Sequence, residues 1–113
     1  MSGKNINIFG IEYAPVQKQS KNRVIIRSAQ SGVHFGTIKS RDGSEVTLVD
    51  SRRLWYWDGA ASLNQMAVSG VSAPANCKFS VNVPEITVLG VCEIIPCTED
   101  AAANIASVKE WKR

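Results

Sequence analysis

The sequence predicts an α+β fold, built from a mostly antiparallel sheet of about six strands and two short helices. Short β-branched or alternating segments recur from residue 23 onward and are separated by turns rich in Gly, Asp and Pro. Two segments, near residues 62 and 98, carry the side chains that cap helix starts. The 113 residues are 44% hydrophobic and 20% charged, which is typical of one globular domain.

The chain divides into an N-terminal arm at residues 1–22 and a single α+β domain at residues 23–113. The arm is heterogeneous, with a short apolar segment at Ile6–Phe9, then Pro15 and a polar run over residues 17–22. Its composition suits a strand of a few residues followed by a solvated connector. We expect the arm to be loosely attached or to dock on a neighbouring subunit.

The first three strands of the domain are expected at Val24–Arg27, Val33–Lys39 and Glu45–Asp50. A three-residue loop at Arg41–Gly43 would place Gly43 in the left-handed position that such loops require. Its register sets Lys39 opposite Glu45, Thr37 opposite Thr47 and His34 opposite Asp50. The alternative two-residue loop would set Lys39 opposite Val46, which is a poorer cross-strand pair.

Residues 51–59, with the sequence SRRLWYWDG, form the most informative segment. In a strand, alternation places side chains of successive residues on opposite faces. One face then carries Arg53, Trp55 and Trp57, and the other carries Arg52, Leu54 and Tyr56. Because both faces hold large apolar groups, we expect this strand to be buried on both sides, within the subunit or against a second one. A homo-oligomer is therefore predicted.

The first helix is predicted to begin at Ser62, because Ser62 and Gln65 form the S-x-x-Q pattern of a capping box. An earlier start through residues 60–61, capped by Asp58, is the alternative. Gly70 is the expected C-cap. The second helix is predicted to begin at Thr98, followed by acidic residues that favour a helix N-terminus. We expect three of its side chains to face the sheet: Ala102, Ile105 and Ala106.

Two further strands lie between these helices. Lys78–Val83 alternates in the manner of a strand, and Pro84 is expected to interrupt it. Glu85–Ile95 is expected to form one long strand that bends near Gly90 and stops at Pro96.

Several chemistries lack their usual sequence signatures. There is no P-loop, no G-x-G-x-x-G and no G-x-S-x-G, and the chain has a single histidine. The cysteines, Cys77, Cys92 and Cys97, are odd in number and lack C-x-x-C spacing, so we expect reduced, buried thiols. We expect no metal and no cofactor. The start of the chain is polar and the longest apolar run, Ile86–Cys92, is short, so we expect a soluble cytoplasmic protein with no membrane partner.

The candidate binding residues combine cations with aromatic rings, which suits a flat, anionic ligand such as a nucleotide. Arginine forks bind phosphate bidentately, while aromatic faces stack on bases. The candidates are Arg52, Arg53, Phe35, Phe79, Arg27, His34, Trp57 and Lys78. For Trp57, core packing is an equally good interpretation. The alternative is that one of the two arginines pairs with Asp50 or Asp58. A His34–Asp50 pair would support a small hydrolase.

Part of the sequence resembles a family of small phage and prophage proteins catalogued as a domain of unknown function. The similar blocks are Val24–Arg27, Gly32–Gly36, Arg41–Gly43, Arg52–Ser62, Asn76–Phe79, Glu93–Thr98 and Trp111–Lys112. The chain is also similar to phage Thoeris anti-defence proteins. These are non-enzymatic, oligomeric proteins that bind glycocyclic ADP-ribose signals, and in some members cyclic oligonucleotides, in the host cytoplasm.

The resemblance implies an anti-defence protein that binds a cyclic nucleotide-derived immune signal without degrading it. Its ligand pockets would lie between subunits, and Arg52, Arg53, Phe35 and Phe79 would be the ligand-binding residues. The alternative is a nucleic-acid-binding or structural accessory protein of a phage. That alternative rests on the net charge of +3 and the basic C-terminus, Lys109–Arg113. The charge is mild for a dedicated DNA-binding protein.

Overall fold

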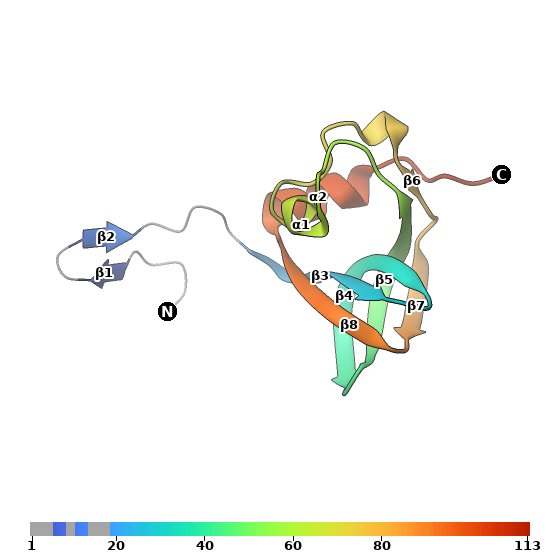
Figure 1. Cartoon of the computed structure of the whole chain (residues 1–113), viewed down its shortest axis with the longest axis horizontal. Helices are drawn as coiled ribbons and strands as arrows, with labels where there is room; N and C mark the ends of the chain where they lie inside the picture. The colour runs from blue at the N-terminus through green and yellow to red at the C-terminus, as the bar shows by residue number, and fades with distance from the viewer. Residues whose placement is uncertain (1–5, 9–10, 14–18) are drawn as a thin grey trace.

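The computed structural model describes residues 6–8, 11–13 and 19–113, and it has the predicted α+β fold. A six-stranded antiparallel sheet packs against two helices (Figure 1). The strands of this sheet are β3 (Gln19–Ser28), β4 (Gly32–Asp42), β5 (Glu45–Tyr56), β6 (Lys78–Phe79), β7 (Val83–Val88) and β8 (Val91–Thr98). The helices are α1 (Leu63–Ser69), α2 (Glu99–Ser107) and a single 3-10 turn at Pro74–Asn76.

Within the predicted arm, two short strands pair with each other. They are β1 (Ile6–Ile8) and β2 (Ile11–Tyr13), and they form a two-stranded antiparallel sheet separate from the main one. The strand predicted at Ile6–Phe9 coincides with β1, although Phe9 lies outside the described residues. The first strand of the main sheet begins at Gln19, four residues before the predicted domain boundary at residue 23.

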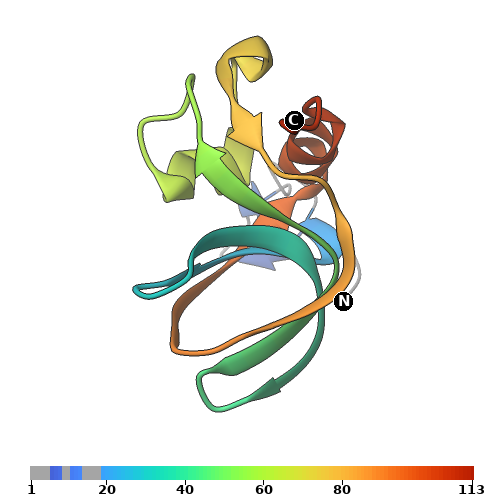
Figure 2. The same ribbon diagram turned by 90° about the vertical axis from the view of Figure 1, so that its right-hand side faces the viewer.

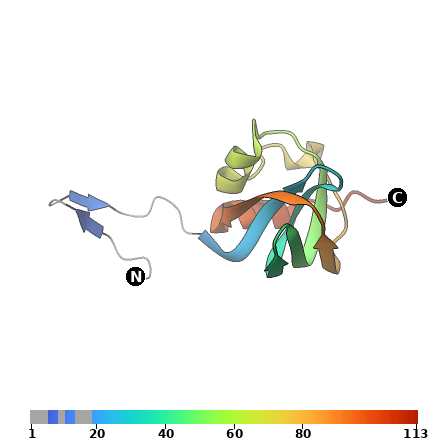
Figure 3. The ribbon, with the colours of Figure 1, turned by 60° about the horizontal axis from the view of Figure 1, so that its bottom comes forward.

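The main sheet is curled, and its two outer strands, β7 and β8, are consecutive in the sequence. The order is β6-β5-β4-β3-β8, and β7 pairs with the first half of β5 on the side opposite β4. β7 then runs through Leu89 and Gly90 directly into β8 at the far edge, so the two edges meet at this turn (Figures 2 and 3). Gly90 has φ +68, a backbone conformation that favours glycine.

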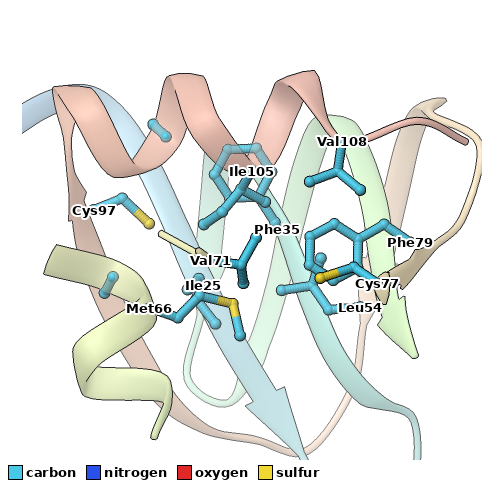
Figure 4. Packing of buried hydrophobic residues seen from close by; sticks show 12 residues of the cluster. Ile25, Phe35, Leu54, Met66, Val71, Cys77, Phe79, Cys97, Ile105 and Val108 are labelled. Atoms are coloured by element: carbon cyan, nitrogen blue, oxygen red, sulfur yellow. The ribbon is translucent and has the colours of Figure 1, made fainter. Parts of the chain in front are cut away.

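The curled sheet has a hydrophobic cluster on each face. The helix-side cluster joins the sheet to α1 and α2, and includes Ile25, Phe35, Leu54, Met66, Phe79 and Ile105 (Figure 4). The curl cluster fills the concave face with Val24, Ile26, Val46, Leu48 and Val88. Successive residues of β3 alternate between these clusters. Burial on both faces explains why this strand is continuously apolar from Val24 to Ile26.

The β4–β5 hairpin differs from the predicted register. Asp42 pairs with Glu45, so the turn consists of two residues, Gly43 and Ser44, rather than the three-residue loop. Gly43 keeps its left-handed φ of +61, but in a two-residue turn. Lys39 is an extra residue on β4 and forms an ion pair with Glu85 of β7 at 2.9 Å, not with Glu45.

A second irregularity lies at Asp50, which has φ +51. Thr37 pairs with Val49 and Phe35 with Arg52, so Gly36 alone faces both Asp50 and Ser51. This is a β-bulge, in which one residue on a strand opposes two on its neighbour. The predicted pair of His34 with Asp50 is wrong, because the turn and the extra Lys39 had already shifted the register, and with the bulge His34 pairs with Arg53.

The helix caps agree with the sequence prediction. Ser62 Oγ accepts a hydrogen bond from the Gln65 N–H at 3.1 Å, and Thr98 Oγ1 accepts one from the Ala101 N–H at 3.1 Å. Gly70 is the C-cap of α1. The buried side chains of α2 are Ala101, Ala102 and Ile105. Ala106, which was predicted to face the sheet, is exposed.

Both proline predictions are wrong. Pro84 lies inside β7 rather than interrupting a strand, and Pro96 lies inside β8. Each of these strands pairs on one side only, where a missing N–H is tolerated. The strand predicted at Lys78–Val83 is broken after Phe79, and the long strand predicted at Glu85–Ile95 is two strands joined at Gly90.

Candidate functional site

Three neighbouring cavities share the side chain of Arg53, and we call them together the Arg53 site. The first, about 250 Å³, is lined by His34, Ser51, Arg53, Trp55, Ser80, Val81, Val83 and Ile86. The second, about 300 Å³, shares His34 and Arg53 and adds Ser31 and Leu89. The third, about 540 Å³, is lined by residues 29–33, Arg53, Leu54, Trp55 and Trp57. None of these linings contains a carboxylate.

The bulge at Asp50 decides which side chains reach this site. Before the bulge, Leu48 of β5 points into the curl cluster. The extra residue reverses the alternation, so Leu54 packs in the helix-side cluster while Arg53 pairs with His34 on the concave face. Ser51 lies on the same face as Arg53, because residues two apart in a strand project together.

Arg53 is half-buried and faces an aromatic ring. Its guanidinium carbon lies 5.2 Å from the centroid of the Trp55 ring, within cation–π range. Its backbone N–H donates to Ser80 Oγ at 2.7 Å, which ties β5 to the segment after β6. Across the described part of the chain, no carboxylate pairs with its side chain. The guanidinium therefore keeps its charge available to a ligand.

Trp55 belongs to an apolar rim around the site. Its side chain is 58% exposed, and Leu89 is 61% exposed. Val81 and Val83 are also exposed and line the same cavity as Trp55. We call Trp55, Val81, Val83 and Leu89 the apolar rim. An exposed tryptophan at the edge of a cavity presents its ring face for stacking.

His34 is buried at the site, with 1% of its surface exposed. Its Nε2 lies 3.0 Å from the carbonyl oxygen of Ser31, which means that Nε2 carries the proton and donates it. Burial lowers the pKa of His34 below its ordinary value of 6.5, and the positive charge of Arg53 lowers it further. The neutral ring is therefore favoured, with Nδ1 as a hydrogen-bond acceptor.

Two buried hydroxyl groups at the site have no hydrogen-bond partner among the described residues: Ser31 Oγ and Ser51 Oγ. Ser51 is 1% exposed, and its Cβ would lie 3.0 Å from a Cβ added at Gly36. The glycine thus makes room for Ser51 beneath the site. Buried polar groups usually have partners, so two orphan hydroxyls lining adjoining cavities are exceptional.

Arg52, the neighbour of Arg53, has a structural role. It is 2% exposed and donates to five backbone carbonyl groups, those of Phe79, Ser80, Ile105, Ala106 and Val108. Three of these carbonyls lie at the C-terminal end of α2, where a cation also suits the helix dipole. Arg52 therefore joins α2 to the sheet, and we correct its assignment to the ligand site.

Phe35 and Phe79 were predicted to stack on a ligand, but both rings lie in the helix-side cluster (Figure 4). They are 3% and 0% exposed, respectively. Phe79 lies beneath the Arg52 guanidinium at 5.5 Å from the ring centroid. Neither ring offers a face to a ligand.

The remaining predicted residues lie at different places. Trp57 follows the end of β5, packs against the helix-side cluster and lines the third cavity. Arg27 is paired with Glu93 of β8 at 2.9 Å, and Lys78 lies 5.5 Å from the Trp111 ring centroid. Only His34, Arg53 and Trp57 of the eight predicted residues line the Arg53 site.

The comparisons with known proteins give a family. The profile of the domain of unknown function DUF6948 matches residues 21–105, well over half of the chain. The chain belongs to the DUF6948 family. No curated protein and no solved structure matches it. The matched range runs from β3 into α2 and contains every residue that lines the Arg53 site, whereas Trp111 lies beyond it.

Sequence reasoning missed several residues of this site, among them Ser31, Ser51 and Trp55. Trp55 was expected to be buried, as was Tyr56, yet both are more than half exposed in the single chain. The serines carry no motif. Strand alternation could have identified Ser51 and Trp55 as neighbours of Arg53, because residues 51, 53 and 55 project from the same face of a strand.

Within the described ranges, no group of three His, Cys, Asp or Glu residues is placed to hold a metal ion. Neither described helix has the length and hydropathy needed to cross a membrane.

Cys77 and Cys97 are buried as predicted, but Cys92 is exposed.

Proposed function

We propose that this protein is a non-enzymatic binding protein that sequesters a cyclic nucleotide-derived immune signal, of the glycocyclic ADP-ribose type or a cyclic oligonucleotide. It would be encoded by a phage and act in the host cytoplasm. The observation that carries the proposal is the Arg53–Trp55 pair. Its guanidinium, which has no carboxylate partner among the described residues, lies beside an exposed indole ring that lines the same cavities.

The chemistry of this pair matches both halves of a nucleotide. A base that stacks on an exposed aromatic ring gains roughly 1–3 kcal/mol. A guanidinium with no carboxylate partner binds phosphate oxygens through charge-assisted hydrogen bonds. The cavity linings contain one cation and no carboxylate, so the local field favours an anion.

Binding without degradation is supported by the surroundings of His34. A general base is usually oriented by a carboxylate, as in hydrolase triads. Here a backbone carbonyl holds Nε2, and the adjacent charge is the cation of Arg53. This environment makes the ring a weaker base, which disfavours the His34 hydrolase as an alternative.

The experiment is a retention assay. The pure protein is incubated with cyclic ADP-ribose isomers, free ligand is removed, and the protein is denatured by heat so that mass spectrometry can analyse what it releases. Recovery of the unchanged signal is expected. Recovery of a degraded signal would indicate an enzyme, and a lack of retention with every signal would refute the proposal.

Variants locate the site. Arg53→Ala and Trp55→Ala are each expected to lower retention at least about tenfold, in line with the loss of one stacking or charge-assisted contact. Tyr56→Ala is the matched control, because Tyr56 is 53% exposed and adjacent to Trp55 but does not line the site. Equal loss in Tyr56→Ala and Trp55→Ala would place the ligand elsewhere.

A second candidate function is nucleic-acid binding near the C-terminus. Lys78 lies over the Trp111 ring, and Lys109 and Trp111 line another cavity of about 450 Å³. Cations with an exposed ring are the usual components of a single-strand binding surface. A gel shift with DNA or RNA that weakens steeply with salt, and that Trp111→Ala abolishes, would favour this function.

A further inference from the structure

The strongest unexplained feature is Ser51, which lines the first cavity and whose buried hydroxyl has no hydrogen-bond partner among the described residues. The neighbouring strand contributes only Gly36 beneath it, and a Cβ there would meet the Ser51 Cβ at 3.0 Å and its Cα at 3.1 Å. A hydroxyl buried without a partner destabilises a fold. The Ser51 hydroxyl therefore contributes little to the stability of the fold. A ligand in the cavity would be in a position to accept a hydrogen bond from it.

We infer that the first cavity is a phosphoryl subsite, in which the Ser51 hydroxyl and the Arg53 guanidinium donate to one phosphoryl group and His34 takes up a proton as that group binds. The inference rests on the proposed function and deepens it. It assigns the phosphoryl group to the floor of the cavity and the base to Trp55 at the rim.

The donors around this cavity have the right character for an oxyanion. Ser51 and Arg53 project from the same face of β5, and both line the cavity with His34 of β4. Ser31, the second orphan hydroxyl, lines the adjoining cavity that shares His34 and Arg53. A serine hydroxyl and a guanidinium both donate to phosphate oxygens.

The uptake of a proton follows from the tautomer of His34. Nε2 is already committed to the Ser31 carbonyl at 3.0 Å, so Nδ1 is the ring atom that can exchange a proton. In the neutral ring this atom has a lone pair, which repels an oxyanion. Once protonated it donates, so a bound anion favours the charged ring.

Arg53 supplies the charge next to His34. Arg53 is the charged residue in the linings of both cavities that His34 shares, and its charge lowers the pKa of the free imidazole together with burial. The facing segment of β3 presents Ile26, and β7 presents Ile86 and Val88. A phosphoryl group bridging Arg53 and His34 would offset the repulsion between the two cations.

The test is isothermal titration calorimetry on the full chain with adenosine 3′,5′-cyclic monophosphate, adenosine and inorganic phosphate. The cyclic phosphodiester does not titrate near neutral pH, so proton uptake measured in buffers of different ionisation enthalpy belongs to the protein. We expect the cyclic nucleotide to bind about tenfold or more tightly than adenosine.

Variants then separate the contributions. Ser51→Ala is expected to lower cyclic nucleotide affinity about tenfold and to leave adenosine affinity unchanged. It should not lower the Tm, because it removes an orphan hydroxyl from the free protein. Ser40→Ala, at an exposed position of β4, is the control and should change neither affinity. His34→Gln should abolish the uptake of a proton on binding.

The outcomes distinguish this inference from the proposed function. If cyclic ADP-ribose isomers are retained but Ser51→Ala does not weaken the binding of any phosphorylated probe, the subsite is refuted and the proposed function stands. If inorganic phosphate binds in a Ser51-dependent manner and no cyclic signal does, the subsite stands and the function is refuted. Proton uptake that persists in His34→Gln refutes the role of His34, and no binding of any probe refutes both proposals.

Discussion

Arg52 and Arg53 show how two adjacent, identical residues acquire different roles. Arg52 points into the protein and donates to five carbonyl groups, whereas Arg53 points to the concave face and has an indole ring as its neighbour. Alternation along the strand predicted that the two arginines project to opposite faces. It could not predict which face holds the core, because both faces carry large apolar residues.

Arg52→Ala is expected to lower the free energy of unfolding by about 3 kcal/mol, because it leaves buried carbonyls at the end of α2 without donors. Arg53→Ala, at the next position, is expected to cost less than about 1 kcal/mol. Urea denaturation of the two variants measures the difference. Similar losses in both would show that Arg52 does not hold α2 to the sheet.

The pH dependence of stability should report on His34. The folded-state pKa lies below 6.5 because of burial and the charge of Arg53. The unfolded chain therefore binds a proton that the folded chain does not, and stability falls as the pH drops through 6.5. Between pH 7 and about 5.5, above the usual range of carboxyl groups, the ligand-free wild type should lose stability more steeply than His34→Gln. Parallel urea-denaturation profiles would contradict this expectation.

At the scale of the element, the bulge in β5 connects the hairpin to the site. Without it, continued alternation from Leu48 would send Arg52 to the concave face and Arg53 toward the helices. A left-handed residue in mid-strand is hard to recognise from sequence, because Asp adopts that conformation only occasionally. The register prediction had already failed at the two-residue turn and at the extra residue Lys39, which excluded the His34–Asp50 pair, and the bulge then shifted the partner of His34 by one further residue, to Arg53.

Substitutions at Asp50 test the bulge. Asp50→Gly should preserve or raise stability, since glycine adopts φ +51 without strain. Asp50→Val should cost roughly 1–2 kcal/mol, because a β-branched residue is disfavoured in the left-handed region. Thermal unfolding provides the comparison, and equal Tm values for the two variants would mean that Asp50 does not hold this conformation in solution.

The elements with local signals were predicted well. Ser62, Gly70 and Thr98 cap their helices because the hydrogen bonds of a cap span only a few residues. The prolines were misread because Pro84 and Pro96 occupy edge strands, and the edge of a sheet is a property of strand order rather than of local sequence.

At the scale of the whole molecule, the curl of the sheet creates both the curl cluster and the Arg53 site beside it. The apolar rim remains exposed in the single chain, and exposed apolar patches often mark interaction sites. We propose that a second copy covers part of this rim, so that the ligand binds between subunits. The expected burial of Trp55 and Tyr56 on both sides is not met within one chain.

Light scattering at micromolar concentration tests this assembly. We expect the wild type to form an oligomer. Leu89→Asp should shift the equilibrium toward the monomer, because burying a carboxylate in an apolar contact costs free energy. Val68→Asp is the control, since Val68 is exposed on α1 outside the rim. A monomeric wild type would contradict the proposed assembly and leave the Arg53 site as a feature of one subunit.

Local sequence was sufficient to predict the α+β class, the helix caps, the strand at Val24–Arg27 and the division of the two arginines between opposite faces. These follow from alternation and from hydrogen bonds between near neighbours, which depend on short stretches of chain. The tertiary structure decided that Arg52 is structural, that Phe35 and Phe79 are core, and that Trp55 accompanies His34 and Ser51 at one site. Those assignments depend on a single bulged residue and on the meeting of β7 with β8, because side chains far apart in sequence become neighbours only when strands pair and the sheet curls.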